Sequence, residues 1–392
     1  MTPEDIRRIR KRIDSTLENF SSIYGCYVNG AGETVAEMEI PVLGMDSEEK
    51  EMYAATLKKV LSGTQERNLI DIEFTPDQVD KSDEHRLLMA LRDSSLKDPN
   101  MREVLYQRIK DNYRNDGDSY VILLASDTYD LRSKDVKGEE WSEESVEQFA
   151  YFLCAICPVK SSKAALQYDA EEQEFRGIST GTLLVAPALG FMFPVLDDGG
   201  ADIYRASYYS KSSSDIHDEL IQALFASEQL PMAADVQKET FNTSLADALG
   251  KECSLDLVTA LQARMSVIAE ESKDDETVNV PVIALEDVED LLADRGVSEE
   301  GIGEFRKTVE ERFDGASDFN INNIIQKKKF EVKTPETRIV TEADNALRLK
   351  TRTIDGVTYI LVPVGESVTV NGVEIAVEFD EADGTNETNE GN

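Results

Sequence analysis

Two uninterrupted apolar runs, residues 120–125 and 149–159, dominate the first half of the chain. Both are rich in aromatic and β-branched residues. Strands buried on both faces show this pattern, because neither side of such a strand meets water. Even the longer run falls well short of the roughly 20 apolar residues that a membrane-spanning helix needs. The sequence therefore predicts strands inside a covered sheet and no membrane span.

Helix and strand patterns alternate around these runs. Thr2 is expected to cap a helix with Pro3 at its first position, and apolar residues then recur at helical spacing through Phe20. The further elements expected are a hairpin of residues 24–29 and 34–42, a helix from Ser47 to Gly63, a strand at 68–74, helices at 83–94 and 99–113, and a β-rich stretch at 182–209. This alternation predicts an α+β domain over residues 1–230, with helices on a mixed sheet.

The pattern becomes almost entirely helical over residues 214–313. Caps are expected at Ser214, Ser254 and Ser298, and helix ends at Gly250 and Gly296. Residues 270–318 hold 17 acidic and five basic side chains, so much of the outer face of these helices must be solvated negative charge. We expect an acidic helical subdomain over residues 231–318.

The remaining residues change character again. Residues 329–333, 347–354, 357–362 and 373–379 alternate as strands, and Asp355-Gly356 and Asn371-Gly372 are strong hairpin turns. Residues 320–379 hold eight basic and eight acidic side chains. The sequence predicts a neutral, antiparallel β module over residues 319–380 and a disordered acidic tail over residues 381–392.

The charge balance limits the partners of the protein. The 392 residues include 78 acidic and 41 basic side chains, which gives a formal net charge of −37. A field of this sign repels phosphate backbones and anionic lipid headgroups, so nucleic acid and membranes are disfavoured. The N-terminus lacks the apolar core of a secretory signal, and four cysteines fit a reducing compartment. We expect a cytoplasmic protein.

Six short segments carry a resemblance to a known family. They are YGCYVNG (24–30), LLMALRDS (87–94), LCAICPV (153–159), GFMFP (190–194), QKETFNT (237–243) and KFEVKTP (329–335). Together they resemble the bacterial family known as domain of unknown function 4317, over nearly the whole chain up to about residue 379. None of these segments is a catalytic signature. The resemblance implies a full-length bacterial family member and assigns no activity or site residue.

Residues 177–181 match the G-x-S-x-G pattern of a nucleophile elbow. Ser179, an acid at Asp197 or Asp202, and His217 follow in the order of an α/β-hydrolase. The elbow needs a helix directly after the serine, whereas residues 182–189 are β-branched and include Pro187. A glycine-rich turn is the favoured interpretation, and a hydrolase is the alternative.

Cys154 and Cys157 form a C-x-x-C pair, which on a tight turn can bind zinc or exchange disulfides. Here the pair lies in an apolar strand, where residues three apart point to opposite faces. We therefore expect buried structural thiols, no metal site and no cofactor. The acidic pairs at 127–130 and 197–198 could hold magnesium, but turn residues at strand ends are the favoured interpretation in so acidic a chain.

Two sequence patterns are similar to those of nucleic-acid-binding proteins, but their details argue against that function. The first helix carries a basic band of Arg7, Arg8, Arg10, Lys11 and Arg12 without interleaved aromatic residues. We expect this band to dock against the acidic body rather than to bind phosphate. Residues 285–313 resemble a helix-turn-helix, but acidic residues open its second helix where DNA phosphates would lie, so an ordinary αα-hairpin is expected.

The neutral β module holds the binding residues that we expect. Arg348, Lys350 and Arg352 alternate along one expected strand and so share a face, with Lys327, Lys328 and Lys329 at the module's entrance. We expect this face to contact an acidic surface, either the chain's own helical layer or a protein partner. A solvated strand face is the alternative. The sequence thus favours a non-catalytic cytoplasmic interaction or regulatory protein of undetermined oligomeric state over a hydrolase whose site is assembled from scattered residues.

Overall fold

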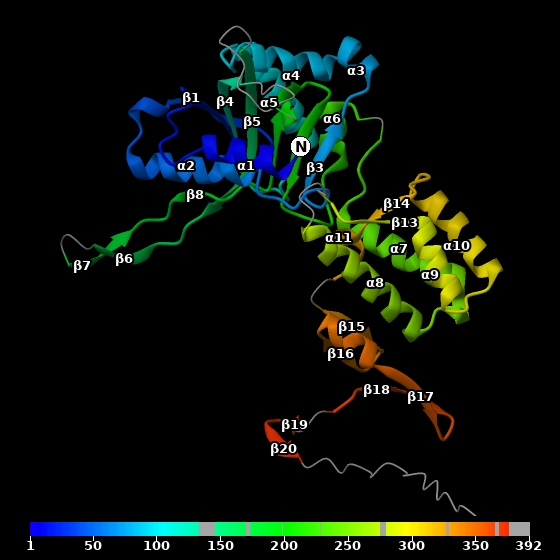
Figure 1. Ribbon diagram of the computed structural model, residues 1–392. Coiled ribbons are helices and arrows are strands. Elements are labelled where there is room, and N and C mark those ends of the chain that lie inside the picture. Colours follow the sequence, from blue (N-terminus) through cyan, green and yellow to red (C-terminus); the bar gives the residue numbers. More distant parts are fainter. Residues whose placement is uncertain are drawn as a thin grey trace, which may run out of the picture.

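The computed structural model describes residues 1–132, 146–169, 173–197, 199–227, 229–274, 280–326, 329–364 and 368–375. Figure 1 shows a sheet with helices packed on it, a group of helices beside it, and a row of small hairpins beyond them. The predicted α+β class is confirmed. No helix within these ranges is long and apolar enough to cross a bilayer.

Eight of the described strands form one sheet in the order β2-β1-β4-β5-β9-β12-β3, with β8 paired to β5. Their bounds are β1 (Ser22–Val28), β2 (Thr34–Pro41), β3 (Leu69–Glu73), β4 (Tyr120–Arg132), β5 (Val146–Ser161), β8 (Thr182–Leu184), β9 (Leu189–Phe193) and β12 (Arg205–Ser210). Every described pairing between the strands of this sheet is antiparallel, which corrects the expected mixed sheet. Consecutive strands such as β1 and β2, or β4 and β5, lie side by side, and neighbours joined without a crossover pair antiparallel.

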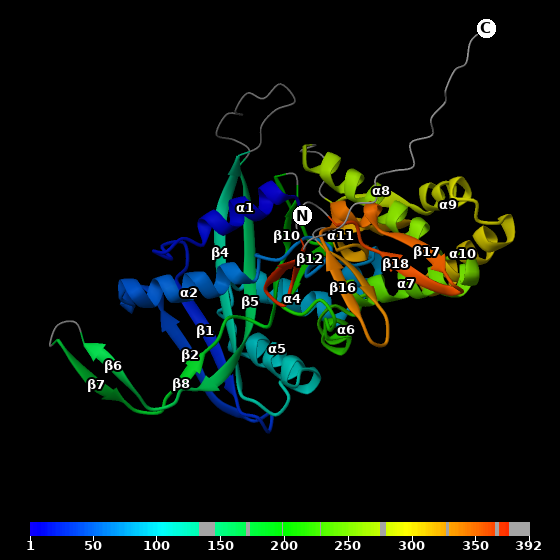
Figure 2. The same ribbon diagram turned by 90° about the horizontal axis from the view of Figure 1, so that it is seen from below.

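Both faces of the sheet are buried along β5, β9 and the first half of β4, as the apolar runs predicted, whereas β2 and β8 are largely exposed. In β5, Phe152 and Cys154 belong to one core, whereas Leu153 and Cys157 belong to the other. Helices α4 (Asp83–Asp93), α5 (Pro99–Asn112) and α6 (Asp218–Phe225) cover the first core, and α1 (Pro3–Arg12) and α2 (Ser47–Lys59) cover the second (Figure 2). Beside these lie α3 (Pro76–Lys81), the 3₁₀ turn η1 (Val42–Gly44) and two separate hairpins, β6 (Ala165–Asp169) with β7 (Glu174–Ile178) and β10 (Val195–Asp197) with β11 (Gly200–Asp202).

Helix α1 begins as the sequence predicts and ends earlier. The Thr2 hydroxyl accepts a hydrogen bond from the backbone N–H of Asp5, and Pro3 occupies the first turn. After Arg12 the side chain of Asp14 accepts the backbone N–H groups of Thr16 and Leu17, both at 3.0 Å. This turn satisfies the backbone locally and ends the helix, although the apolar residues that follow still enter the same core.

A partly buried ion pair connects α1 to the sheet. Arg12 Nε lies 2.6 Å from one carboxylate oxygen of Asp127, and its Nη2 lies 3.0 Å from the other. The Asp127 side chain is 2% exposed and also accepts the hydroxyl of Tyr151 at 3.1 Å. The Arg12 guanidinium stacks over the ring of Tyr129, 4.1 Å from its centroid. The expected docking of the basic band is confirmed for Arg12, and Asp127 lies inside β4 rather than at the expected strand end.

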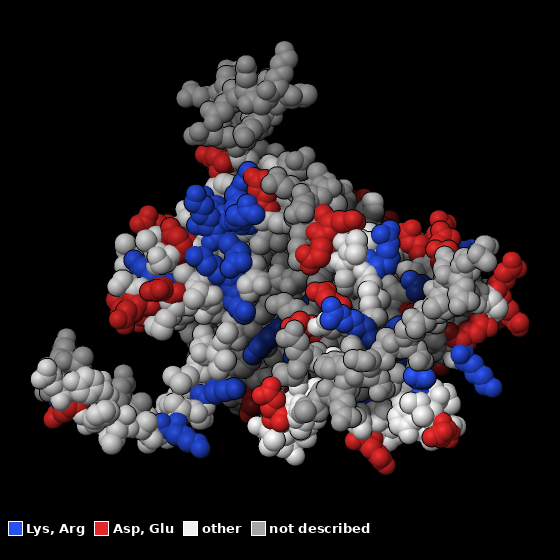
Figure 3. Space-filling model, turned by 60° about the horizontal axis from the view of Figure 1, so that its bottom comes forward, with Lys and Arg blue, Asp and Glu red and all other residues white. Residues whose placement is uncertain are grey.

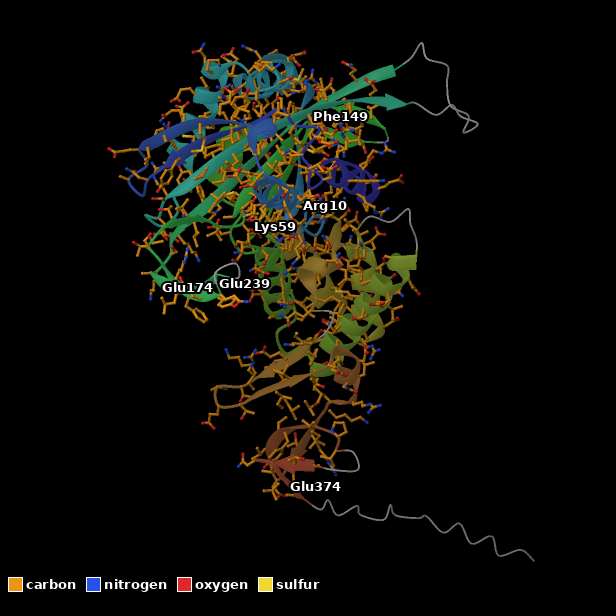
Figure 4. The ribbon with its side chains drawn as sticks, turned by 90° about the vertical axis from the view of Figure 1, so that its left-hand side faces the viewer. Arg10, Lys59, Phe149, Glu174, Glu239 and Glu374 are labelled. Atoms are coloured by element: carbon orange, nitrogen blue, oxygen red, sulfur yellow. The ribbon has the colours of Figure 1, made fainter. Side chains whose placement is uncertain are left out.

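The other basic residues of α1 stay at the surface. Arg7, Arg10 and Lys11 are exposed, and no described carboxylate forms an ion pair with them. Figure 3 shows basic side chains gathered over this part of the molecule, and Figure 4 shows Arg10 of α1 and Lys59 of α2 on the same side. For Arg7, Arg10 and Lys11, the structure does not support the expected docking against the acidic body.

The second group of helices has its own apolar core. It consists of α7 (Ala234–Leu249), η2 (Gly250–Glu252), α8 (Leu255–Asp274), α9 (Leu285–Asp294), α10 (Glu299–Arg312) and α11 (Ile321–Ile324), with β13 (Val282–Ala284) paired to β14 (Asp318–Asn320). Ser298 caps α10 as predicted, by accepting the N–H of Gly301. Ser214 does not cap a helix, because α6 starts later, with His217 before its first residue. Glu289 and Arg306 pair between α9 and α10, so the ordinary αα-hairpin is confirmed.

The C-terminal part is a row of hairpins rather than one sheet. They are β15 (Phe330–Lys333) with β16 (Arg338–Thr341), β17 (Lys350–Ile354) with β18 (Val357–Leu361), and β19 (Val368–Val370) with β20 (Val373–Ile375), with the 3₁₀ helix η3 (Ala343–Arg348) between the first two. The two predicted turns are present: Asp355 and Gly356 have φ of 50° and 80°, and Asn371 and Gly372 have φ of 50° and 82°. The expected domain boundaries remain predictions, and the expected tail lies outside the described residues.

The ion pair of Arg12 gives a stability prediction. Replacing Arg12 with Ala leaves the buried Asp127 carboxylate without its cation, so we expect the free energy of unfolding to fall by roughly 2–4 kcal/mol. Urea denaturation followed by circular dichroism measures this. Arg10→Ala removes the same charge from an exposed site of the same helix and should change stability by less than about 0.5 kcal/mol. Equal effects of the two variants would contradict a role for the pair.

Candidate functional site

One face of the β17–β18 hairpin combines cations with apolar side chains. Lys350 lies opposite Leu361, Arg352 opposite Tyr359, and Ile354 opposite Val357. Alternate residues of a strand, and directly opposed residues of an antiparallel pair, point to the same side. We call these six side chains the hairpin face. All are exposed, including Tyr359 at 47% and Val357 at 54%, and Figure 1 shows the hairpin extending from the helices.

Arg348 does not join this face. It is the last residue of η3, so it precedes the strand instead of alternating along it. The reason is the apolar side chain that follows: Leu349 is 7% exposed and packs with Ala346 and Phe330 against α8. Burial of Leu349 fixes the chain in a 3₁₀ turn at this point. The expected three-residue stripe is therefore reduced to Lys350 and Arg352.

The β module contacts the chain's own helical layer through apolar side chains. Leu255 and Val258 of α8 pack against the cluster of Phe330, Ala346 and Leu349. Within the described ranges, no carboxylate forms an ion pair with Lys350 or Arg352. The cations of the hairpin face are consequently open to another molecule. Lys327 and Lys328, expected at the entrance of the module, lie outside the described residues.

A groove of about 350 Å³ lies between α7, α8, α11 and β15. Its floor is apolar and consists of Phe241, Leu245, Leu261, Met265 and Ile324, all buried. Its rim carries Lys238, Lys329 and Lys333, together with the carboxylate of Glu331 and the amides of Asn242 and Gln262. No sequence pattern predicts this groove, because its walls come from four elements between residues 238 and 333.

The electrostatics of the groove are dominated by its lysines. Glu331 accepts a hydrogen bond from Arg338 at 2.8 Å, and this contact holds the pKa of the carboxyl below its ordinary value. The positive charges of Lys333 and Lys238 lower the pKa of Glu331 further. No described carboxylate forms an ion pair with any of the three rim lysines. The rim thus carries surplus positive charge in a strongly acidic chain.

The structure does not bring the hydrolase candidates together. Ser179 lies between β7 and β8, so a strand follows it where an elbow requires a helix. The carboxylate of Asp202 accepts from Arg205 at 2.5 Å and from the backbone of Tyr204 at 2.9 Å. His217 precedes α6, with its ring against Tyr113, and Figure 1 shows that helix well away from the β6–β7 hairpin. Asp197 pairs with Arg205, and its expected neighbour Asp198 lies outside the described residues.

The two cysteines of the C-x-x-C pair point to opposite faces of β5, as predicted. Cys154 lies in the core under α4 and α5, and Cys157 lies in the core under α1 and α2. Burial raises the pKa of Cys154 well above its ordinary value and that of Cys157 to about 12. One metal ion cannot bind both sulfurs across the sheet. Among the described residues no group of three metal-binding side chains comes together.

A carboxyl group with a raised pKa lies where the sheet meets the helical core. The loop before β3 holds Glu66, whose backbone carbonyl accepts the side chain of Asn323 at 2.7 Å, while Arg67 donates to the carbonyl of Asn322 at 2.9 Å. The Glu66 side chain lies at this junction and is exposed. Desolvation, with the negative charge of Asp71, raises the pKa of Glu66 to about 7.

The model of the family Domain of unknown function (DUF4317) matches residues 1–373, which include the groove and the hairpin face. The chain belongs to this family. No curated protein matches the sequence. Membership in the DUF4317 family confirms the resemblance of the six segments and leaves the assignment of function to the residues themselves.

The burial of the cysteines predicts their reactivity. In the native DUF4317 chain at pH 8, a thiol reagent should modify the partly exposed Cys253 much faster than Cys154 or Cys157, because a buried thiol with a raised pKa forms little thiolate. Mass spectrometry of timed samples measures this. All four cysteines should react after unfolding in guanidinium. Rapid native labelling of Cys154 and Cys157 would show that β5 is not buried on both faces.

Glu66 gives a prediction of pH dependence. Since its folded pKa lies above the unfolded value, the native state binds the extra proton, and stability falls as pH rises from about 4.5 to about 7. Glu66→Gln removes the titrating group, so its melting temperature relative to the parent should be higher at pH 8 than at pH 5. Glu18→Gln controls for the loss of one negative charge from the surface. A difference that is the same at both pH values would contradict the raised pKa.

Proposed function

We propose that this protein is a non-catalytic interaction or regulatory protein of the bacterial cytoplasm, and that its hairpin face binds an acidic surface of a protein partner. The observation that carries the proposal is the presence, on one side of β17–β18, of four exposed apolar side chains and two cations that form no ion pair with any carboxylate in the described part of the chain. Interfaces between proteins are rich in this combination, and arginine and tyrosine supply much of their binding energy. Arg352 lies directly opposite Tyr359.

The composition of the face favours a protein over nucleic acid. Ile354, Val357 and Leu361 offer aliphatic surface, which gains by burial against apolar groups and gains nothing from phosphates. The net charge of −37 opposes the approach of a polyanion, whereas a partner with a local acidic patch meets the two cations at short range. The apolar contact of η3 with α8 further supports an external partner, because it holds the module without using these cations.

The test compares charge-matched variants of the full chain. The tagged protein is used to recover partners from a lysate of its own bacterium, and the dissociation constant of each recovered partner is then measured with purified components. We expect the double variant Lys350→Ser and Arg352→Ser to weaken binding about tenfold or more, with a further loss for Tyr359→Ser. The control is the double variant Lys251→Ser and Lys307→Ser, which removes two exposed lysines from the helical part.

The salt dependence provides a second readout. Binding of the parent chain should weaken as ionic strength rises, and the variant without Lys350 and Arg352 should lose much of that dependence, because salt screens exposed charges. Unchanged partners and unchanged affinities for the double variant would sink the proposal. So would an equal loss in the control variant, which would indicate an effect of net charge alone.

A further inference from the structure

The groove between α7, α8, α11 and β15 is separate from the hairpin face and is not used by the function proposed above. Its floor is formed by one aromatic and four aliphatic or thioether side chains that are at most 5% exposed. Its volume of about 350 Å³ lies in the range of roughly 300–1,000 Å³ that is usual for small-molecule sites. A ligand that displaces water from this floor must present apolar surface to it.

The rim determines the polar end of such a ligand. Lys238 comes from α7, whereas Lys333 comes from β15 and Lys329 directly precedes that strand, so the ammonium groups approach the groove from two sides. Glu331, the one carboxylate among the described residues that line the groove, already accepts a hydrogen bond from Arg338. The three lysines outnumber this one carboxylate, which is already hydrogen-bonded, so the mouth of the groove carries net positive charge. The complementary ligand group is an anion.

The apolar floor also excludes a polypeptide as the best occupant. An extended peptide would bring backbone N–H and C=O groups that Phe241, Leu261 and Met265 cannot satisfy, which costs free energy for every buried polar group. A helix satisfies its own backbone but has a diameter of roughly 10–12 Å, too wide for a space of this volume. An alkyl chain brings no polar group to the floor.

We infer that this groove binds a single-chain anionic amphiphile, an alkyl chain that ends in a carboxylate. The chain lies along the floor formed by α7 and α8, and the carboxylate lies among Lys238, Lys329 and Lys333. The amide of Gln262, which donates to the carbonyl of Gln326 at 3.2 Å, borders the groove and closes one part of its wall. This site shares no residue with the hairpin face.

The experiment is calorimetric titration of the full chain with octanoate, decanoate and dodecanoate, each below the concentration at which it forms micelles. The affinity should rise about three- to fourfold for each methylene that enters the groove, and it should level off once the floor is filled. Dodecyltrimethylammonium, with the same chain and a positive head, should bind at least about tenfold more weakly than dodecanoate, because the rim repels it.

Variants locate the binding at the groove. The double variant Lys238→Gln and Lys333→Gln should lower the affinity for dodecanoate about tenfold or more, whereas Lys251→Gln with Lys307→Gln should leave it unchanged. All four positions are at least partly exposed, so the fold should tolerate the changes, and circular dichroism checks this. The variant Lys350→Ser with Arg352→Ser should bind dodecanoate like the parent, which separates this site from the hairpin face.

Three outcomes would overturn the inference. One is the absence of saturable binding of any of the three carboxylates. Another is equal affinity for dodecanoate and dodecyltrimethylammonium, which would indicate apolar adsorption without a role for the lysines. The third is an unchanged affinity for dodecanoate in the variant Lys238→Gln with Lys333→Gln.

Discussion

The pairing of β4 with β5 is the constraint on which the two cores of the sheet depend. The two strands align residue by residue from Tyr120 opposite Pro158 to Arg132 opposite Val146. Because successive side chains of such strands enter opposite cores, helices must cover both faces, and each face is apolar enough to hold them. The same pairing positions Asp127 beside Tyr151 and so creates the buried acceptor that fastens α1 through Arg12.

The loop that precedes β3 connects the sheet to the helical core. The carbonyl of Thr64 accepts the N–H groups of Arg67, Asn68 and Leu69, which holds the loop in a tight turn, with Glu66 at a φ of 55°. A left-handed conformation costs free energy for a residue with a side chain and persists only where the surroundings enforce it. Here two hydrogen bonds hold the loop: Asn323 donates to the carbonyl of Glu66, and Arg67 donates to the carbonyl of Asn322. The strained loop therefore also connects the sheet to the helical core.

Patterns that depend on near neighbours in the sequence were predicted well. The apolar run at 149–159, the cap at Thr2 and the turn at Asp355-Gly356 each follow from local periodicity or backbone preference, and the structure confirms all three. Arg348 was misplaced because its conformation is decided by burial of Leu349 against α8, nearly 100 residues earlier in the chain. The groove was missed for the same reason. Its apolar floor looks, in sequence, like ordinary helix core, and only the tertiary arrangement leaves part of that core open.

The groove shares residues of α8 and β15 with the apolar cluster that holds the β module on the helical core, and this has a thermodynamic consequence. Phe330 and Val258 line the groove and also belong to the cluster that holds η3, and with it the start of β17, on the helical core. A molecule in the groove therefore contacts the side chains that position the hairpin face. If it binds the docked arrangement more tightly than a detached one, it must stabilise the docking by the same free energy, since linkage is reciprocal. Because the cluster has few buried members, Phe330, Ala346 and Leu349, a modest binding energy is enough to change how firmly the module is held.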